Sequence, residues 1–213
     1  PTPGAFPICR DQAESVPSGF FSSLNVFGQI LGCYLVCSSP RGLTLIDQHA
    51  AHERVFFEKF RRQLIGGDVQ MQSLLIPQTI ELTAGELMLV ERKLSDLGRL
   101  GFVLEPFGPD SYAITSVPAL LAEGDYRPIV RQMVAELAEV DNSEKPRQQL
   151  EERLATIACH SVIRANRKLE IREMQALLSE LDQIEFATQC PHGRPVLIEF
   201  SRDELDRLFK RVL

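Results

Sequence analysis

The sequence lacks the marks of several protein classes. No apolar run approaches the roughly 18 residues that a membrane helix needs, and no signal peptide opens the chain. The net charge of −6 excludes a protein that coats nucleic acid with a generally basic surface. The five cysteines are odd in number and scattered, which indicates a reducing compartment instead of a disulfide framework. We therefore expect a cytoplasmic protein with no membrane partner.

The beginning of the chain predicts a linker. Residues 1–19 are rich in proline, serine and glycine, and the first residue is proline, not methionine. We therefore expect the C-terminal part of a longer protein. The rest of the chain has room for one large domain or two small ones.

Strand and helix patterns alternate after the linker. Thr83 and Glu86 have the spacing of a capping box, and turn residues separate the segments. This pattern predicts an α/β fold of the α+β type with a mixed sheet. Strands are expected at 24–39, 43–47, 72–82, 101–107, 111–118 and 196–201, and helices at about 50–64, 84–97, 128–140, 148–165, 170–184 and 202–213.

Two subdomains are expected. The β-α-β-β-α run from about residue 79 to residue 140 is self-contained enough to be inserted into another subdomain. The boundaries that follow are a linker at 1–19, one subdomain formed by 20–71 and 151–213, and an external subdomain at 72–150.

Three short motifs concentrate carboxylate, imidazole and thiol side chains. His49 and Glu53 are four residues apart on a predicted helix, so both project from one face of it. That face is otherwise apolar, and an unpaired ionised Glu53 there would cost several kcal/mol. The motifs contain Asp47, His49, His52 and Glu53, then Cys159 and His160, then Cys190 and His192.

This set of side chains predicts a metal site. Carboxylate, imidazole and thiolate are the ligands that zinc prefers, and the oxygen-rich part could hold Mn²⁺ or Mg²⁺. A bound cation would explain why His49 and Glu53 face inward. Taken alone, these two residues could be a solvated helix start, and Cys159 a small buried apolar residue.

Four ordered motifs resemble those of a known family. They are DQHAAHERVFFE from Asp47, ACHSVIRANRKL from Ala158, CPHGRP from Cys190 and LFKRVL from Leu208. In this order they are similar to motifs of the MutL DNA mismatch-repair family. The chain resembles the C-terminal dimerisation and endonuclease domain of bacterial members, over nearly all of its length after the linker.

The resemblance implies a fold and an activity. Family members have a dimerisation subdomain built from both ends of the domain and an external, regulatory subdomain between them. Members with the acidic motif nick duplex DNA during mismatch repair, so we expect a metal-dependent endonuclease. Members without the motif only dimerise, and a non-catalytic dimerisation module with a structural zinc is the alternative.

The resemblance also implies roles for the site residues. Asp47, His49 and Glu53 would be catalytic and hold Mn²⁺ or Mg²⁺, while Cys190 and His192, with Glu53, would hold zinc. The positions that match the family's metal site are Asp47, His49, Glu53, Cys159, Cys190 and His192, with Gln48, Glu58 and Arg194 expected around them.

The sequence also suggests places or roles for side chains outside the expected ligand set. Glu58 lies about 180° around the helix from the metal-facing residues, so we expect it to point outward or to support the ligands. Cys33 and Cys37 lie in a strand pattern and are expected in the core. His52 and His160 are extra ligands, proton shuttles or peripheral groups.

The expected partners follow from apolar segments and from the resemblance. Apolar strands at 24–36 and a terminal helix through Phe209 predict a homodimer, unless they only form the core. QSLLIP at 72–77 resembles a β-sliding-clamp motif, unless it only leads into the next strand; its binding residues would be Gln72, Leu74, Leu75 and Pro77.

The longer protein is expected to supply the remaining partners. No glycine-rich phosphate loop occurs in this chain, so ATP would act only through the family's N-terminal domain. Duplex DNA at the bacterial nucleoid and a MutS-type mismatch-recognition protein complete the set that the resemblance implies.

Overall fold

The computed structural model describes residues 17–121, 124–140, 168–185 and 187–211. The chain divides into two compact units, Pro1–Val55 with Arg164–Leu213 (unit 1) and Phe56–Ile163 (unit 2). Both units combine an antiparallel sheet with helices, so the α+β class is confirmed. The predicted mixed sheet is wrong for the described residues, because every pairing between the named strands is antiparallel. None of the described helices is long and apolar enough to cross a membrane.

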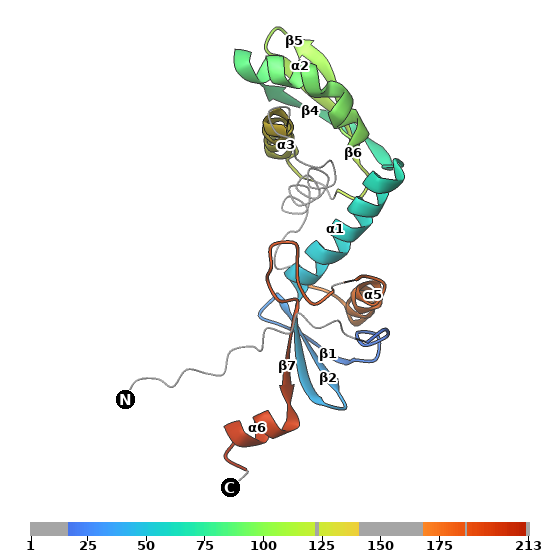
Figure 1. Ribbon diagram of the computed structural model, residues 1–213, viewed down its shortest axis with the longest axis vertical. Helices are drawn as coiled ribbons and strands as arrows, with labels where there is room; N and C mark the ends of the chain where they lie inside the picture. Colours follow the sequence, from blue (N-terminus) through green and yellow to red (C-terminus); the bar gives the residue numbers. More distant parts are fainter. Residues whose placement is uncertain (1–16, 122–123, 141–167, 186, 212–213) are drawn as a thin grey trace, which may run out of the picture. The chain divides into compact units, whose positions relative to one another are not determined.

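Unit 1 is built on a four-stranded sheet in the order β1-β2-β3-β7 (Figure 1). The strands are β1 (Asn25–Ile30), β2 (Tyr34–Ser39), β3 (Gly42–Asp47) and β7 (Leu197–Ser201). Alternate side chains of each strand share one face, so Leu35, Cys37 and Ile46 enter one core. Buried residues of α5 (Ile171–Leu181) and the first turns of α1 (Gln48–Gly66) belong to the same core.

The opposite face of this sheet carries apolar side chains that are only partly buried. The strand register places Ile30 opposite Tyr34, and Leu45 between Val36 and Ile198. Directly opposite residues lie on the same face of a sheet, so these side chains form one surface. We call it the open sheet face and define it as Ile30, Tyr34, Val36, Leu43, Leu45, Ile198 and Phe200.

The turn between β1 and β2 has an unusual residue at its tip. Leu31 has a φ of 50° and Gly32 a φ of 71°, and Cys33 N donates to Ile30 O across the turn. Two left-handed residues define a turn in which asparagine and glycine are normally preferred, because a larger side chain is strained there. Leu31 is also 82% exposed, so an apolar side chain is held in a costly conformation in contact with solvent.

Unit 2 contains a three-stranded sheet in the order β4-β6-β5, formed by β4 (Met71–Glu81), β5 (Val103–Gly108) and β6 (Ser111–Pro118). Its core also takes residues from α2 (Ala84–Arg99) and α3 (Arg127–Val140). The predicted capping box is confirmed: Thr83 N donates to Glu86 Oε2 at 2.8 Å, and Glu86 N donates to Thr83 Oγ1 at 3.3 Å.

Strand β4 is interrupted in the segment that resembles a clamp motif. Its pairing with β6 breaks between Ser73 and Gln78, so residues 74–77 lie outside the ladder. Leu75 is 99% exposed and Ile76 is 79% exposed. A pair of solvent-exposed apolar side chains on a segment without ladder partners is a feature that the extended pattern of the sequence did not predict.

Two details differ from the expected elements. Helix α1 begins at Gln48 instead of Ala50, and α6 (Arg202–Leu208) ends well before residue 213. Lys210 has a φ of 54°, which ends the helical conformation after Phe209. The helix expected at 148–165 lies outside the described residues.

Candidate metal centre

The first turn of α1 is fixed by the residue that precedes it. Asp47 ends β3, and its Oδ1 accepts hydrogen bonds from His49 N at 2.8 Å and Ala50 N at 3.1 Å. These backbone groups have no partners within a helix, so the carboxylate acts as an N-terminal cap. The cap explains why α1 begins two residues earlier than its apolar pattern predicts, and it sets the direction in which Glu53 points.

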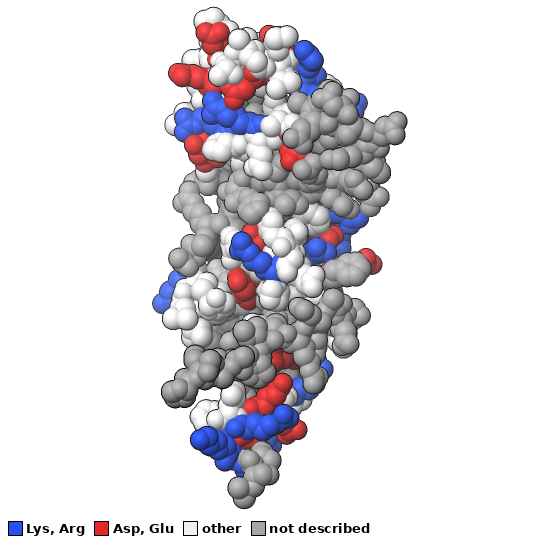
Figure 2. All heavy atoms as spheres, turned by 60° about the vertical axis from the view of Figure 1, so that its left-hand side comes forward, with Lys and Arg blue, Asp and Glu red and all other residues white. Residues whose placement is uncertain are grey.

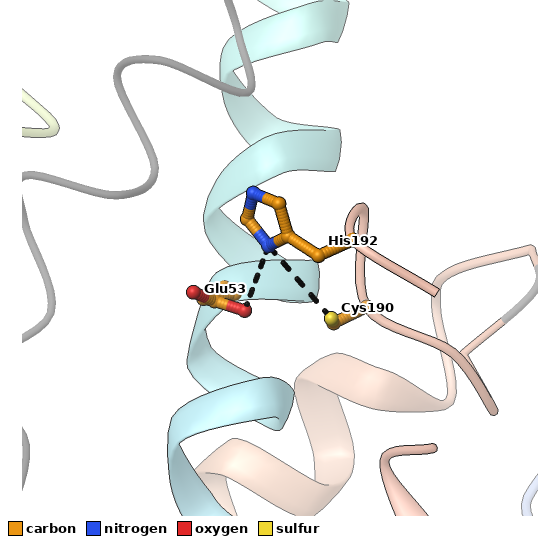
Figure 3. A group of neighbouring side chains, drawn as sticks. All are labelled: Glu53, Cys190 and His192. Carbon is orange, nitrogen blue, oxygen red and sulfur yellow. Dashed lines mark hydrogen bonds and ion pairs between the residues drawn. The ribbon is translucent and has the colours of Figure 1, made fainter. Parts of the chain in front are cut away.

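Glu53 meets two side chains from a loop that is far away in sequence (Figure 3). Its Oε2 lies 3.3 Å from His192 Nδ1, and Cys190 Sγ lies 3.9 Å from the same nitrogen. One ligand atom from each of the three residues lies within 4.8 Å of the others, so they form a possible metal-binding group. Glu53 is 1% exposed and Cys190 is also buried.

The CPHGRP loop is folded tightly against the end of β3. Cys190 N donates to Arg194 O at 2.8 Å, and Gly193 N donates to Cys190 O at 2.9 Å. Gly193 has a φ of 77°, a conformation that glycine adopts without strain. Asp47 N in turn donates to Val196 O at 2.9 Å. Backbone hydrogen bonds therefore hold the two motifs side by side.

His49 adds a second imidazole beside the same carboxylate. Its Nε2 lies 3.1 Å from Glu53 Oε1, so the two oxygens of Glu53 face one histidine each. Its Nδ1 is buried and has no hydrogen-bond partner among the described residues. A buried nitrogen without a partner is costly, and binding a cation or a water molecule would satisfy it.

The geometry of the group fits a zinc ion. A tetrahedral zinc with ordinary bond lengths separates an oxygen ligand from a nitrogen ligand by about 3.4 Å, and a sulfur ligand from a nitrogen ligand by about 3.6 Å. The corresponding separations here are 3.3 Å and 3.9 Å. Oxygen, nitrogen and sulfur donors around one point also match the chemistry of zinc. The residues present therefore fit the metal that their sequence motifs suggest.

The thiol of the group is kept protonated by its surroundings. Burial raises the pKa of Cys190, and the carboxylate of Glu53 adds to this effect. Hydrogen bonds from the backbone of His192 and Arg194 oppose it only in part. Because a metal binds the thiolate, it must displace this proton.

The other described residues expected near the metal do not belong to the group formed by Glu53, Cys190 and His192. Asp47 and His49 do not belong to the group of mutually close ligand atoms, although His49 contacts Glu53. Gln48 is buried and accepts a hydrogen bond from Gln29. Arg194 is exposed, and its carbonyl supports Cys190.

Glu58 corrects an expectation from the helical wheel. It does not point outward: it is buried, in unit 2, and its Oε2 lies 3.6 Å from Arg61 Nη1. The wheel fails because α1 continues into unit 2, where a different side of the helix is covered. His52 Nδ1 lies 2.8 Å from Gln48 O, so one of its ring nitrogens is engaged by its own helix. Cys159 and His160 lie outside the described residues.

The sequence analysis missed two residues whose hydrogen bonds hold the segments around the metal group. Gln29 bonds to Gln48 across the unit, and Arg54 Nη2 donates to Glu185 O at 2.9 Å, next to the segment that leads into the Cys190 loop. Neither residue belongs to a motif or has a characteristic spacing. No signal in the sequence could have identified them.

Comparison with known proteins shows what the chain is similar to. The family model described as "MutL C terminal dimerisation domain" matches residues 27–169. The chain is 45% identical to the DNA mismatch repair protein MutL of Syntrophotalea carbinolica over 95% of its own length and 32% of the relative. The corresponding protein of Geotalea uraniireducens is 44% identical over 94% of this chain and 33% of the relative. The chain thus spans about a third of these relatives.

The protonated thiol predicts how zinc binding depends on pH. Between pH 7 and pH 8 we expect the apparent affinity for Zn²⁺ to rise about tenfold for the proton that leaves Cys190. Competition with a fluorescent chelator under reducing conditions measures this slope. Cys190→Ser should bind at least about tenfold more weakly and lose the slope, whereas Cys33→Ser should behave as the parent. A pH-independent affinity in the parent would show that Cys190 is not a ligand.

Proposed function

The chain belongs to the MutL C-terminal dimerisation domain family, and we propose that it forms the metal-dependent DNA-nicking domain of a mismatch-repair protein. The observation that carries the proposal is the meeting of Glu53, Cys190 and His192, with His49 against the same carboxylate. A domain that binds no metal has no need to bury a carboxylate between two imidazoles. Zinc and a catalytic Mn²⁺ or Mg²⁺ are the cofactors that we propose.

The residues at the start of α1 have separate tasks in this proposal. A divalent ion, when bound, supplies positive charge for the scissile phosphate and lowers the pKa of the attacking water. Asp47, His49 and Glu53 would hold that ion, and the Asp47 cap keeps the other two on the correct turn. One nitrogen of the His49 imidazole would hold the ion and the other would carry the ring proton, so His49 would act as a ligand and not as a base.

A second candidate function rests on the same group. The thiolate of Cys190 is a soft ligand, which zinc accepts readily, and Glu53 is almost completely buried. Both features suit a structural zinc site that has no open coordination position. In that case the chain is a dimerisation module and the metal holds the loop against α1. The two functions differ in one measurable respect, because only the first requires nicking that depends on Mn²⁺ or Mg²⁺.

DNA binding would depend on other parts of the repair machinery. The chain carries a net charge of −6, and on the face drawn in Figure 2 blue and red side chains are interspersed over the described residues. A surface of this kind attracts a phosphate backbone only weakly. We propose that the ATPase domain of the longer protein, a MutS-type protein and the sliding clamp bring duplex DNA to the site, at the bacterial nucleoid.

The open sheet face is the proposed homodimer contact. It consists of apolar side chains from all four strands, and we propose that the contact extends to the exposed Leu31 in the β1–β2 turn; Phe27 and Phe209 are further exposed apolar residues of unit 1. Surfaces of this kind on a sheet mark protein interfaces, and a two-fold contact buries the same face of both copies. The family description as a dimerisation domain supports this choice of partner.

The interrupted part of β4 is the proposed clamp contact. Residues 74–77 leave the ladder between Ser73 and Gln78, and the exposed pair Leu75 and Ile76 lies within them. An extended segment with apolar side chains and a proline can bind in an apolar pocket and lose little conformational entropy. A segment that served only as a lead-in to the strand would not need apolar side chains in solvent.

Asp47→Asn tests the nicking activity. Asparagine caps a helix as well as aspartate does, so α1 should keep its start and the chain its unfolding free energy. Nicking of supercoiled plasmid by the full-length protein with Mn²⁺ should fall by roughly two orders of magnitude, as when one electrostatic group is removed from an active site. Asp203→Asn, an exposed change of the same charge, is the control. Parent-like nicking by Asp47→Asn would remove Asp47 from the mechanism.

Leu31→Asn tests the dimer contact. Asparagine relieves the strain of the left-handed turn, so the hairpin should become slightly more stable. Loss of a leucine that is buried only in the dimer costs about 2 kcal/mol, so dissociation should become easier by about tenfold or more in sedimentation equilibrium. Leu75→Asn, in unit 2, should leave the dimer unchanged. An unaltered dimer constant for Leu31→Asn would place the contact elsewhere.

Gln72→Ala combined with Pro77→Ala tests the clamp contact. Both residues are exposed, so folding and metal content should be retained. Stimulation of nicking by the sliding clamp should disappear, while basal nicking by the full-length protein stays at the parental rate. Gln70→Ala is the matched control on the same approach to β4. If the double variant is stimulated as strongly as the parent, residues 72–77 are only a lead-in to the strand.

A further inference from the structure

Gln29 is a partly buried side chain of β1 that bonds to three other segments. Its Nε2 donates to Gly32 O at 2.7 Å and to Gln48 Oε1 at 2.5 Å. Its Oε1 accepts a hydrogen bond from Leu169 N at 2.9 Å. One amide therefore connects the β1–β2 turn, the first residue of α1 and the segment that leads into α5.

The same turn also holds the backbone of Gln48. Cys33 O accepts a hydrogen bond from Gln48 N at 2.8 Å. Gln48 is thus fixed at its backbone by the turn and at its side chain by Gln29. Both contacts come from the β1–β2 hairpin, which is separate from the motifs that carry the metal-binding side chains.

Gln48 is next to the residues whose positions matter for a metal. Asp47 precedes it, His49 follows it, and Glu53 lies in the next turn of the same helix. The first turn of a helix frays easily because its N–H groups have no partners within the helix. A ligand set, in contrast, must be held within about 0.5 Å of its working geometry.

We propose that Gln29 is a positioning residue for the metal centre, acting through Gln48 on the first turn of α1. The inference rests on the proposed function only in so far as the group binds a metal. The bonds of Gln29 to Gly32, Gln48 and Leu169 restrict the place where the helix of the proposed ligands begins. Second-sphere hydrogen bonds of this kind typically change metal affinity by about 10- to 100-fold.

A merely structural role for Gln29 makes a different prediction. In that case the bond to Leu169 is the important one, and its loss lowers stability without altering the metal site. Two single variants separate these roles. Gln29→Met removes its bonds to Gly32, Gln48 and Leu169, while Gln48→Met removes the bond between the two amides and leaves Gln29 bonded to Gly32 and Leu169.

Cobalt is the probe, because the visible absorption of Co²⁺ reports ligand geometry as well as affinity. We expect Gln29→Met and Gln48→Met each to bind Co²⁺ about tenfold more weakly than the parent, with an altered spectrum. The double variant should be no weaker than either single one, since both act through one bond. Gln175→Met, the same change on the solvent side of α5, is the control.

Each result decides the proposal. Parental affinity and spectrum in Gln48→Met, or additive losses in the double variant, would overturn it, and Gln48→Met decides alone if Gln29→Met does not fold. A parent that binds no Co²⁺ or Zn²⁺ would also overturn it, because there would be no metal to position. If the affinities follow the expected pattern but the full-length parent nicks no DNA, the positioning role stands and only the nicking function fails.

Discussion

Glu53 sets the main constraint on unit 1, because its carboxylate is almost completely removed from water. An ionised carboxylate in such a place must be balanced, and here each of its oxygens faces an imidazole. One imidazole comes from the same helix and the other from a loop more than a hundred residues later. The requirement to pair this charge therefore links two distant parts of the chain, and it produces the donor set that fits zinc.

The architecture around this carboxylate serves to keep the start of α1 in one place. Asp47 caps the helix, and Asp47 N reaches Val196 O at the far side of the loop that carries Cys190 and His192. The β1–β2 hairpin holds Gln48 from another direction. The helix cap, the backbone bond to Val196 and the contacts from the β1–β2 hairpin all fix the consecutive residues Asp47 and Gln48. So many contacts at one point indicate that the position of the helix start matters.

The sheet of unit 1 separates the two proposed roles of the chain. One face contributes Leu35, Cys37 and Ile46 to the core that also contains the first turns of α1, and the open sheet face presents apolar side chains away from that core. Strand alternation makes this division automatic, since neighbouring residues point to opposite sides. Binding between copies and binding of a metal can thus coexist on strands of only five or six residues.

The sequence by itself determined the α+β class, most strands and helices, and the capping box at Thr83, because these depend on local periodicity and on hydrogen bonds between near neighbours. It also brought the residues of the metal group to attention, since a glutamate is rarely placed on an otherwise apolar helix face, and since Cys190 and His192 are zinc-type ligands only two residues apart. Their assignment to one group was decided by tertiary structure, which brings Cys190 and His192 to Glu53 and leaves Asp47 as a helix cap. The burial of Glu58, the strained Leu31 and the Gln29–Gln48 bond were also decided there. The burial of Glu58 was missed because a helical wheel assumes a single environment along the helix, whereas α1 has residues in both units. The Gln29–Gln48 bond was missed because a hydrogen bond between two glutamines nineteen residues apart produces no periodic pattern in the sequence.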